Sequence, residues 1–150
     1  MIDPAPTTKI DSTLARGRLE EVHEATATKP ACAVLSFPNT SYRMQLVPSG
    51  GVDALSDRVG TTVIGRITAK ARRVDKVGAG GRYIEPVAGR PRRVQGSVVA
   101  ADPAKNTITV SAGAPITCTL TDQRQKASDF EAGDFVSFDV ERGAAFTLDA

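Results

Sequence analysis

Short runs of alternating hydrophobic and polar residues recur along the chain, separated by stretches rich in Gly, Pro, Asn and Asp. Successive side chains of a strand point to opposite faces of a sheet, so such runs predict half-buried strands. The separating stretches have turn chemistry, as in Pro38-Asn39-Thr40-Ser41. The pattern predicts an all-β protein, with strands over residues 14–22, 31–37, 42–47, 61–74, 96–101, 107–111, 116–121, 135–141 and 144–148.

The runs follow the same order twice. The first copy runs from about Arg16 to Val74, and its opening glycine, Gly17, lies 43 residues before a later glycine, Gly60. The second runs from about Val94 to Leu148, and the corresponding glycines, Gly96 and Gly133, are 37 residues apart. The two copies agree in the order of their alternating runs and in the placement of glycines and turns, rather than in residue identity. This agreement predicts an internal repeat.

A short helical turn is expected before the later glycine of each copy, over residues 52–57 and 128–131. In the second turn, Ser128 as N-cap and Glu131 three residues on have the spacing of a capping box. The last two strands of the chain are expected to form a hairpin that turns at Arg142-Gly143.

The repeat divides the 150 residues into an arm (1–13), a first unit (14–76), a connector (77–93) and a second unit (94–150). A lone unit of about sixty residues buries only a marginal core. We therefore expect the two units to pack on each other or on another chain.

The order of strand, strand, strand, short helix, strand and strand is that of an oligonucleotide/oligosaccharide-binding (OB) barrel. The second copy carries the runs Gly96-Ser97-Val98-Val99-Ala100, Thr107-Ile108-Thr109-Val110, Ile116-Thr117-Cys118-Thr119-Leu120-Thr121 and Phe130-Glu131-Ala132-Gly133-Asp134-Phe135-Val136. In these runs it resembles the transport-associated OB modules that pair up in molybdate-binding proteins, and cold-shock and S1-type RNA-binding domains. The resemblance covers both copies, roughly 115 of the 150 residues. It implies two tandem OB-like barrels, each with about five strands and at most a short helical turn.

The chain departs from these families at their binding residues. It has no stretch resembling the Phe-Gly-Phe strands of cold-shock domains. The Ser/Thr–Lys anion site of the molybdate family has only a loose parallel in Thr68-Ala69-Lys70-Ala71. The resemblance therefore carries over no functional residues.

Charge is distributed unevenly along the chain. Residues 58–96 hold ten Lys and Arg against two acids, a charge of +8, whereas the whole chain has a charge of only +2 and the remainder therefore −6. This basic segment includes the last strand of the first unit and the connector.

Three interpretations of the basic segment stay open. It can bind a polyanion, because Arg side chains pair with phosphates and an aromatic ring stacks on a base. It can be an assembly element, in which Tyr83-Ile84-Glu85-Pro86-Val87 lies in a groove of the partner unit or docks on another subunit of a homo-oligomer. It can be a solvated linker, since Gly78-Ala79-Gly80-Gly81 is a flexible sequence.

We expect a non-enzymatic protein that binds single-stranded nucleic acid, with RNA favoured on fold analogy alone. An Arg-lined groove would follow the backbone, with Tyr83 or Tyr42 stacking on a base. Binding of a small oxyanion between paired barrels is a further alternative. The residues expected to bind nucleic acid or another anion are Arg66, Lys70, Arg72, Arg73, Arg82, Tyr83, Arg90, Arg92 and Arg93.

Other chemistry has little support in the sequence. Cys32 and Cys118 lack the C-x-x-C spacing of a zinc site, and the only histidine, His23, lies among acids, so no metal or cofactor is expected. No Ser/His/Asp arrangement or nucleotide fingerprint is present, so we expect no enzyme activity. No apolar run approaches the roughly 18 residues of a membrane span, and the N-terminus has no signal-peptide pattern. A cytoplasmic protein is expected.

Overall fold

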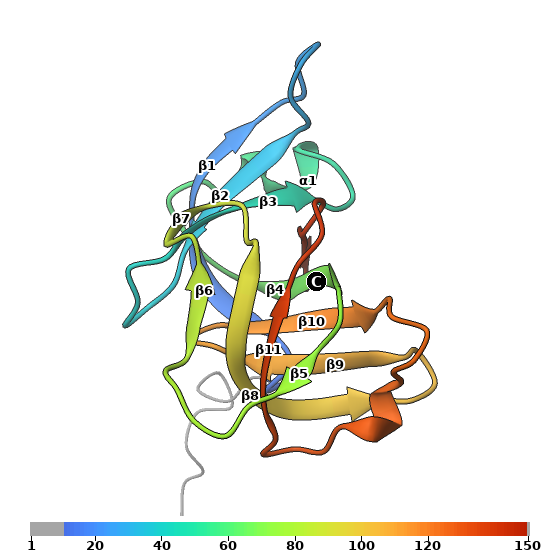
Figure 1. Ribbon diagram of the computed structural model, residues 1–150. Helices are drawn as coiled ribbons and strands as arrows, with labels where there is room; N and C mark the ends of the chain where they lie inside the picture. The colour runs from blue at the N-terminus through green and yellow to red at the C-terminus, as the bar shows by residue number, and fades with distance from the viewer. Residues whose placement is uncertain (1–10, 150) are drawn as a thin grey trace, which may run out of the picture.

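The computed structural model describes residues 11–149, and almost all of its regular structure is β (Figure 1). The all-β prediction is therefore confirmed. The strands are β1 (Ala15–His23), β2 (Cys32–Ser36), β3 (Arg43–Pro48), β4 (Thr62–Ala71), β5 (Asp75–Lys76), β6 (Tyr83–Glu85), β7 (Ala88–Gly89), β8 (Arg93–Asp102), β9 (Thr107–Ser111), β10 (Pro115–Leu120), β11 (Phe135–Asp139) and β12 (Ala145–Leu148). The helical segments are α1 (Asp53–Ser56) and the 3-10 turn η2 (Ala127–Asp129).

Five of the strands close into a barrel. β1 pairs antiparallel with β2 and with β4, and β2 pairs antiparallel with β3. The remaining gap is filled by β12, which runs parallel to β3 and antiparallel to β4. Alternate side chains of these strands face the barrel interior, where Leu19, Leu35, Met44, Ile67 and Phe146 are fully buried.

The pairing of β12 corrects the predicted C-terminal hairpin. The chain leaves β11 and crosses to the closed barrel (the red segment in Figure 1), so β12 does not pair with β11. Two residues explain this choice, because Phe146 fills the barrel core and Gly65 of β4 leaves room for it. A Cβ at Gly65 would lie 2.3 Å from the carbonyl oxygen of Thr147 and 2.5 Å from the Phe146 ring.

The second half of the chain forms a similar set of strands. β8 pairs antiparallel with β9 and β11, and β9 pairs antiparallel with β10. The end of β4 runs parallel to β10, and β5 runs antiparallel to β11. In Figure 1, β4 lies between the upper strands and β10. Each half of the chain therefore supplies a strand to the other half.

The two halves repeat one local backbone geometry. The first hairpin of each half has a β-bulge, immediately after Leu19 in one and after Val98 in the other. The Leu19 carbonyl accepts a hydrogen bond of 2.7 Å from the N–H of Gly60, and the Val98 carbonyl accepts one of 2.8 Å from Gly133. Both glycines have positive φ, of 87° and 98°, a conformation that favours glycine.

The two helical turns lie close to their predicted positions, but the predicted capping of the second turn is not observed. α1 falls within the predicted segment and buries Leu55. The prediction of Ser128 as the N-cap of η2 is wrong, because the turn begins at Ala127. Ala127 is held there by a hydrogen bond of 2.9 Å from its N–H to Asn106 Oδ1, and the Asp129 carboxylate accepts a bond of 3.0 Å from the N–H of Lys126.

The connector contains two short strands that pair with other strands of the same chain. β6 pairs with β8, β7 pairs with β3, and Ile84 is 1% exposed. Part of the apolar segment expected to lie against the partner unit or another subunit therefore packs on β8 of its own chain, whereas Val87 is exposed. The predicted arm falls mainly on residues outside the described range; at its end, the Asp11 carboxylate accepts hydrogen bonds from the N–H and hydroxyl of Thr13.

Candidate polyanion-binding cleft

Four cationic side chains line one cleft of about 660 Å³, named here the basic cleft: Lys29, Arg90, Arg92 and Arg142. Its walls come from three separate parts of the chain, which are the β1–β2 loop, the segment between β7 and β8, and the crossing that precedes β12. Its floor is formed by residues 45–47 of β3. No carboxylate lines the basic cleft among the residues that the structure describes.

The positive charge of the basic cleft is not neutralised by the protein. Within residues 11–149, none of its four cations forms an ion pair. Desolvation, and then the neighbouring charges of Arg142 and Arg92, lower the pKa of the Arg90 guanidinium. Like charges gathered without a counter-charge create a positive potential that attracts anions.

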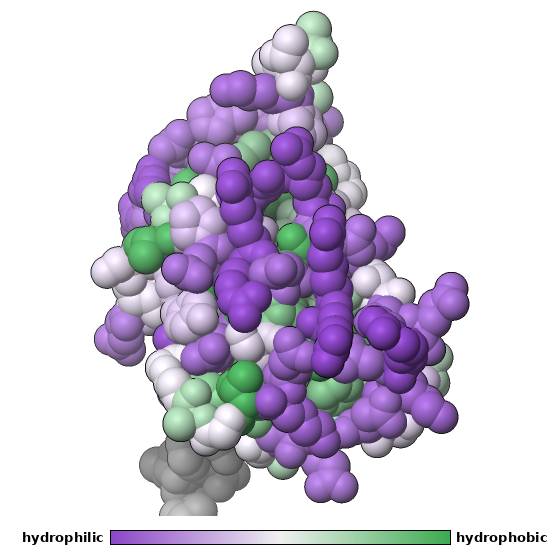
Figure 2. Space-filling view, in the orientation of Figure 1, coloured by the Kyte–Doolittle hydropathy of each residue, from purple (hydrophilic) through white to green (hydrophobic). Residues whose placement is uncertain are grey.

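The backbone fixes the position of these side chains. The N–H of Arg92 donates a hydrogen bond of 2.8 Å to the carbonyl of Glu85, and the carbonyl of Arg92 accepts one of 2.8 Å from Val140. Pro91 is buried between Arg90 and Arg92. Figure 2 shows hydrophilic side chains gathered over the centre of the face where β8 and the crossing to β12 meet. The two arginines therefore stand on an ordered wall rather than on a loose linker.

A second cleft of about 530 Å³ adjoins the basic cleft and shares Lys29, Pro30, Cys32 and Gln45 with it. Its other polar lining residues are of mixed charge, so it is named here the mixed cleft: Glu21, His23, Glu24, Thr26 and Arg43. The two clefts together form one continuous surface over β2 and β3.

Within the mixed cleft the two carboxylates differ in their partners. Glu21 contacts His23 at 2.8 Å and Arg43 at 2.5 Å, and hydrogen bonds from these two side chains lower the pKa of Glu21. Glu24 has no ion pair or hydrogen bond to any described side chain. Its acceptor oxygens are open to a ligand.

A third cleft, of about 460 Å³, is lined by residues from both halves of the chain and is rich in threonine. Arg66 lines it, together with Lys105 and the hydroxyl-bearing Thr68, Thr107 and Thr117. Asp102 is its one carboxylate among described residues, and its Oδ1 already accepts two backbone N–H bonds. This cleft is less basic than the first.

The structure separates the nine residues expected to bind an anion. It places Arg90 and Arg92 together in the basic cleft and Arg66 in the threonine-rich cleft. Lys70 and Arg72 are exposed at the end of β4 and beyond it.

The other expected cations have partners within the protein. Arg73 forms an ion pair of 3.1 Å with Asp75, and Arg82 donates to Ser97 at 3.0 Å. Arg93 donates to the Asp139 carboxylate and to the Ser137 hydroxyl, each at 2.8 Å, and the bond to Asp139 raises the pKa of Arg93.

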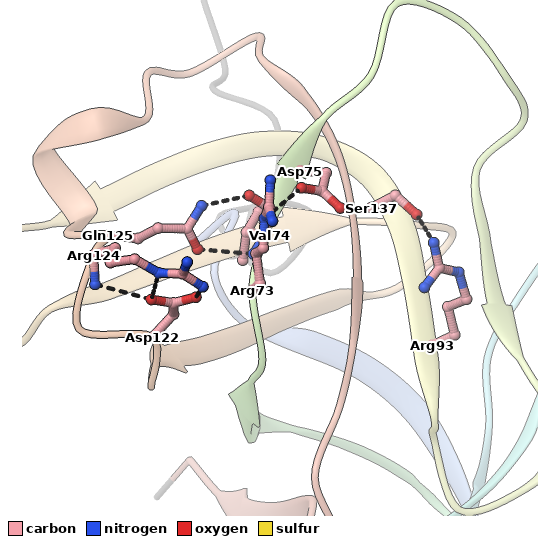
Figure 3. A network of polar contacts seen from close by, with 8 residues as sticks. All are labelled: Arg73, Val74, Asp75, Arg93, Asp122, Arg124, Gln125 and Ser137. Carbon is pink, nitrogen blue, oxygen red and sulfur yellow. Dashed lines mark hydrogen bonds and ion pairs between the residues drawn. The ribbon is translucent and has the colours of Figure 1, made fainter.

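The neighbourhood of Arg73 and Arg93 is a structural network (Figure 3). The Gln125 side-chain amide accepts from the N–H of Val74 at 2.8 Å and donates to its carbonyl at 2.6 Å. Arg124 pairs with Asp122 nearby. The bonds of Gln125 hold the chain that follows β4 against the loop after β10. The polar groups of this network therefore have partners within the protein.

Neither tyrosine lines any of these three clefts. Tyr83 is half-buried and donates to Gln95 Oε1 at 3.3 Å. Tyr42 packs against the core, and its hydroxyl has two partners in the backbone. Among the described residues that line the basic and mixed clefts there is no Phe, Tyr or Trp, and the imidazole of His23 is the one aromatic ring.

The charge pattern of the sequence missed Lys29 and Arg142, because both lie outside the basic segment. They lie on the segments before β2 and before β12, which the fold brings beside Arg90 and Arg92.

No helix within residues 11–149 has the length and hydrophobicity needed to cross a membrane. The same range contains no group of three or more His, Cys, Asp or Glu side chains arranged to hold a metal ion. Burial raises the pKa of the Cys118 thiol and of the Cys32 thiol, so both are protonated at neutral pH. Comparison of the chain with protein-family models, curated proteins and solved structures finds no match.

Proposed function

We propose that this protein is a non-enzymatic binder of single-stranded nucleic acid, with RNA favoured, and that the basic cleft holds the phosphates. The observation that carries the proposal is the cluster of Lys29, Arg90, Arg92 and Arg142 with no carboxylate partner among the described residues. An uncompensated cluster of this kind costs free energy in the free protein and gains it when phosphate enters. Fold analogy alone favours RNA over DNA.

The architecture supports the same conclusion. The closed barrel has the strand order β1-β2-β3-β12-β4, with the α1 turn between β3 and β4. We infer that it is an OB-like barrel, and that units 14–76 and 94–150 form two such barrels by exchanging their fifth strands. OB folds bind ligands on the face of their second and third strands, beside the loops that border the basic cleft.

The mechanism follows from the side chains present. Arg guanidinium groups donate paired hydrogen bonds to phosphate oxygens, and Lys29 adds a point charge. No Phe, Tyr or Trp is among the described residues that line either cleft, and the one imidazole, that of His23, contacts Glu21. Affinity therefore comes mainly from phosphate contacts, and it falls steeply as salt rises.

Fluorescence anisotropy of a labelled single-stranded RNA of mixed sequence tests the proposal. At about 0.7 per phosphate contact, four contacts predict a slope of log Kobs against log salt of about −2.8. Replacing Arg90 and Arg142 by Gln halves that slope, to about −1.4.

Arg124→Gln is the matched control, because Arg124 is exposed and pairs with Asp122 away from the basic cleft. It should leave the slope nearly unchanged. No binding of mixed RNA or DNA oligonucleotides at low salt would overturn the proposal.

A small oxyanion is the second candidate ligand, because the same four cations in a cleft of about 660 Å³ can surround one tetrahedral anion. It predicts a thermal shift at near-stoichiometric molybdate, sulfate or phosphate, without length-dependent binding of oligonucleotides. Docking on a partner subunit and self-association stay predictions, which light scattering tests.

A further inference from the structure

The basic cleft and the mixed cleft are one continuous surface whose two ends have different chemistry. Lys29 and Gln45 line both clefts. One end carries only positive charge, whereas the other carries carboxylates beside hydrogen-bond donors. A ligand that spans both ends therefore has an anionic part joined to a neutral part rich in N–H donors. A nucleotide within a nucleic acid strand has this composition.

Glu24 is the group in the mixed cleft whose carboxylate can accept hydrogen bonds from a base and so discriminate between bases. It lines the cleft, is exposed, and has no polar partner among described side chains. Both oxygens of Glu21 already contact His23 and Arg43. An ionised carboxylate is an acceptor only, so Glu24 binds the base edge that offers it two N–H donors side by side.

Guanine is the base with that edge. Its N1–H and N2 amino group donate in parallel, and its O6 accepts beside them. Adenine and cytosine place a ring nitrogen acceptor next to their amino group, which would face a carboxylate oxygen with its lone pair. Uracil offers one N–H between two carbonyl oxygens. Single-stranded RNA exposes these edges to proteins.

The mixed cleft also holds donors for O6 of guanine. The Gln45 side-chain amide and the Arg43 guanidinium line it, and within the described chain no hydrogen bond to protein occupies the NH₂ group of Gln45. Arg43 is held in place by its contact with Glu21. Acceptor and donor groups therefore stand in the same cleft, in the combination that a guanine edge requires.

We propose that the mixed cleft selects guanine in the strand whose phosphate occupies the basic cleft, and that Glu24 is the residue that sets this preference. The inference rests on the proposed function, since it names the base bound beside the phosphate site. Hydrogen bonds to a charged group are strong enough to give about tenfold discrimination.

The test uses four labelled nine-nucleotide RNAs of uridine in which the central base is guanine, adenine, cytosine or uracil. A single guanine avoids quadruplex formation. The wild-type chain should bind the guanine-containing RNA about tenfold more tightly than the others. In Glu24→Gln, the side-chain NH₂ group faces the N–H donors of guanine and can accept no hydrogen bond from them. The ratio of affinities for the guanine RNA and the other RNAs should therefore fall to within about twofold.

Two further variants separate the base site from the phosphate site. Arg90→Gln should weaken binding of all four RNAs alike and leave the guanine ratio unchanged. Glu131→Gln removes an exposed carboxylate outside both clefts, and it should change neither quantity.

The outcomes distinguish the guanine preference from the proposed binding of nucleic acid. Salt-dependent binding with equal affinity for the four RNAs, or a guanine preference that survives Glu24→Gln, would overturn this inference and leave the proposed function standing. Absence of binding to every RNA at low salt would remove the proposed function and the inference together.

Discussion

The hydroxyl of Tyr42 donates a hydrogen bond of 2.8 Å to the carbonyl oxygen of Ala112, in the other half of the chain. The same hydroxyl accepts a bond of 2.9 Å from the N–H of Ile84 in the connector. The Tyr42 ring also packs against Gly113, where a Cβ would lie 2.9 Å from the ring. One side chain thus joins three segments that are distant in sequence.

Removing this hydroxyl should destabilise the protein. In Tyr42→Phe the N–H of Ile84 loses its partner although Ile84 itself is buried, and an unsatisfied buried donor costs about 1–3 kcal/mol. Urea unfolding measures the loss. Tyr83→Phe is the control, because its longer bond of 3.3 Å to Gln95 lies on a half-buried side chain. Equal losses for the two variants would contradict the role assigned to Tyr42.

Gly65 should be intolerant of a side chain because β12 lies directly against it. A Cβ would come within 2.3 Å of the Thr147 carbonyl oxygen, so Gly65→Ala must displace β12 and with it the buried Phe146. Overpacking of this kind costs about 1–3 kcal/mol in the free energy of unfolding. Gly78→Ala is the matched control, since nothing lies within 4 Å of its Cβ position. A Gly65→Ala variant as stable as Gly78→Ala would show that β12 does not dock as described.

The alternation of the sequence predicted strands well and their partners poorly. The run at 107–111 coincides with β9, because alternation of apolar and polar residues indicates a strand, although Thr109 is buried there as well as Ile108 and Val110. The same property made β12 visible as a strand but gave no indication that it joins β3 and β4. Pairing depends on contacts between distant residues, such as Phe146 with Gly65, which a local pattern does not contain. β6 and β7 have three and two residues, too few to show a period.

The candidate site was predictable only in part for a similar reason. Local charge density identified Arg90 and Arg92, whereas Lys29 and Arg142 reach the basic cleft through the fold. Charge density also included Arg93, whose partner Asp139 lies 46 residues away in sequence. Whether a cation can bind a ligand depends on whether the fold places a carboxylate beside it. For Arg93 this is decided by the pairing of β8 with β11.

Asp122 should contribute to the loss of stability in acid. Hydrogen bonds from the side chain and backbone of Arg124 lower the pKa of Asp122 from 3.8 to about 2. A carboxylate whose pKa is depressed in the folded state stabilises it above the unfolded pKa, and this contribution is lost as pH falls from about 4 to about 2. Urea unfolding between pH 2 and pH 5 should therefore show a shallower pH dependence for Asp122→Asn. Asp57→Asn, at an exposed residue without an ion pair in the described chain, should keep the wild-type slope.

The basic cleft should make the free protein less stable at low ionic strength. Arg142→Gln removes one of four neighbouring positive charges that lack a carboxylate partner in the described chain, so its melting temperature should exceed that of the wild type in dilute buffer. The difference should vanish in high salt, because salt screens the repulsion between exposed charges.

Arg124→Gln should show the opposite sign in the same thermal scans, since it removes an attractive pair with Asp122. Inorganic phosphate should stabilise the wild type more than Arg142→Gln at equal ionic strength, because a ligand that binds only the folded state raises its stability. If Arg142→Gln and Arg124→Gln shifted the melting temperature in the same direction at low salt, the charges of the basic cleft would not be repelling one another.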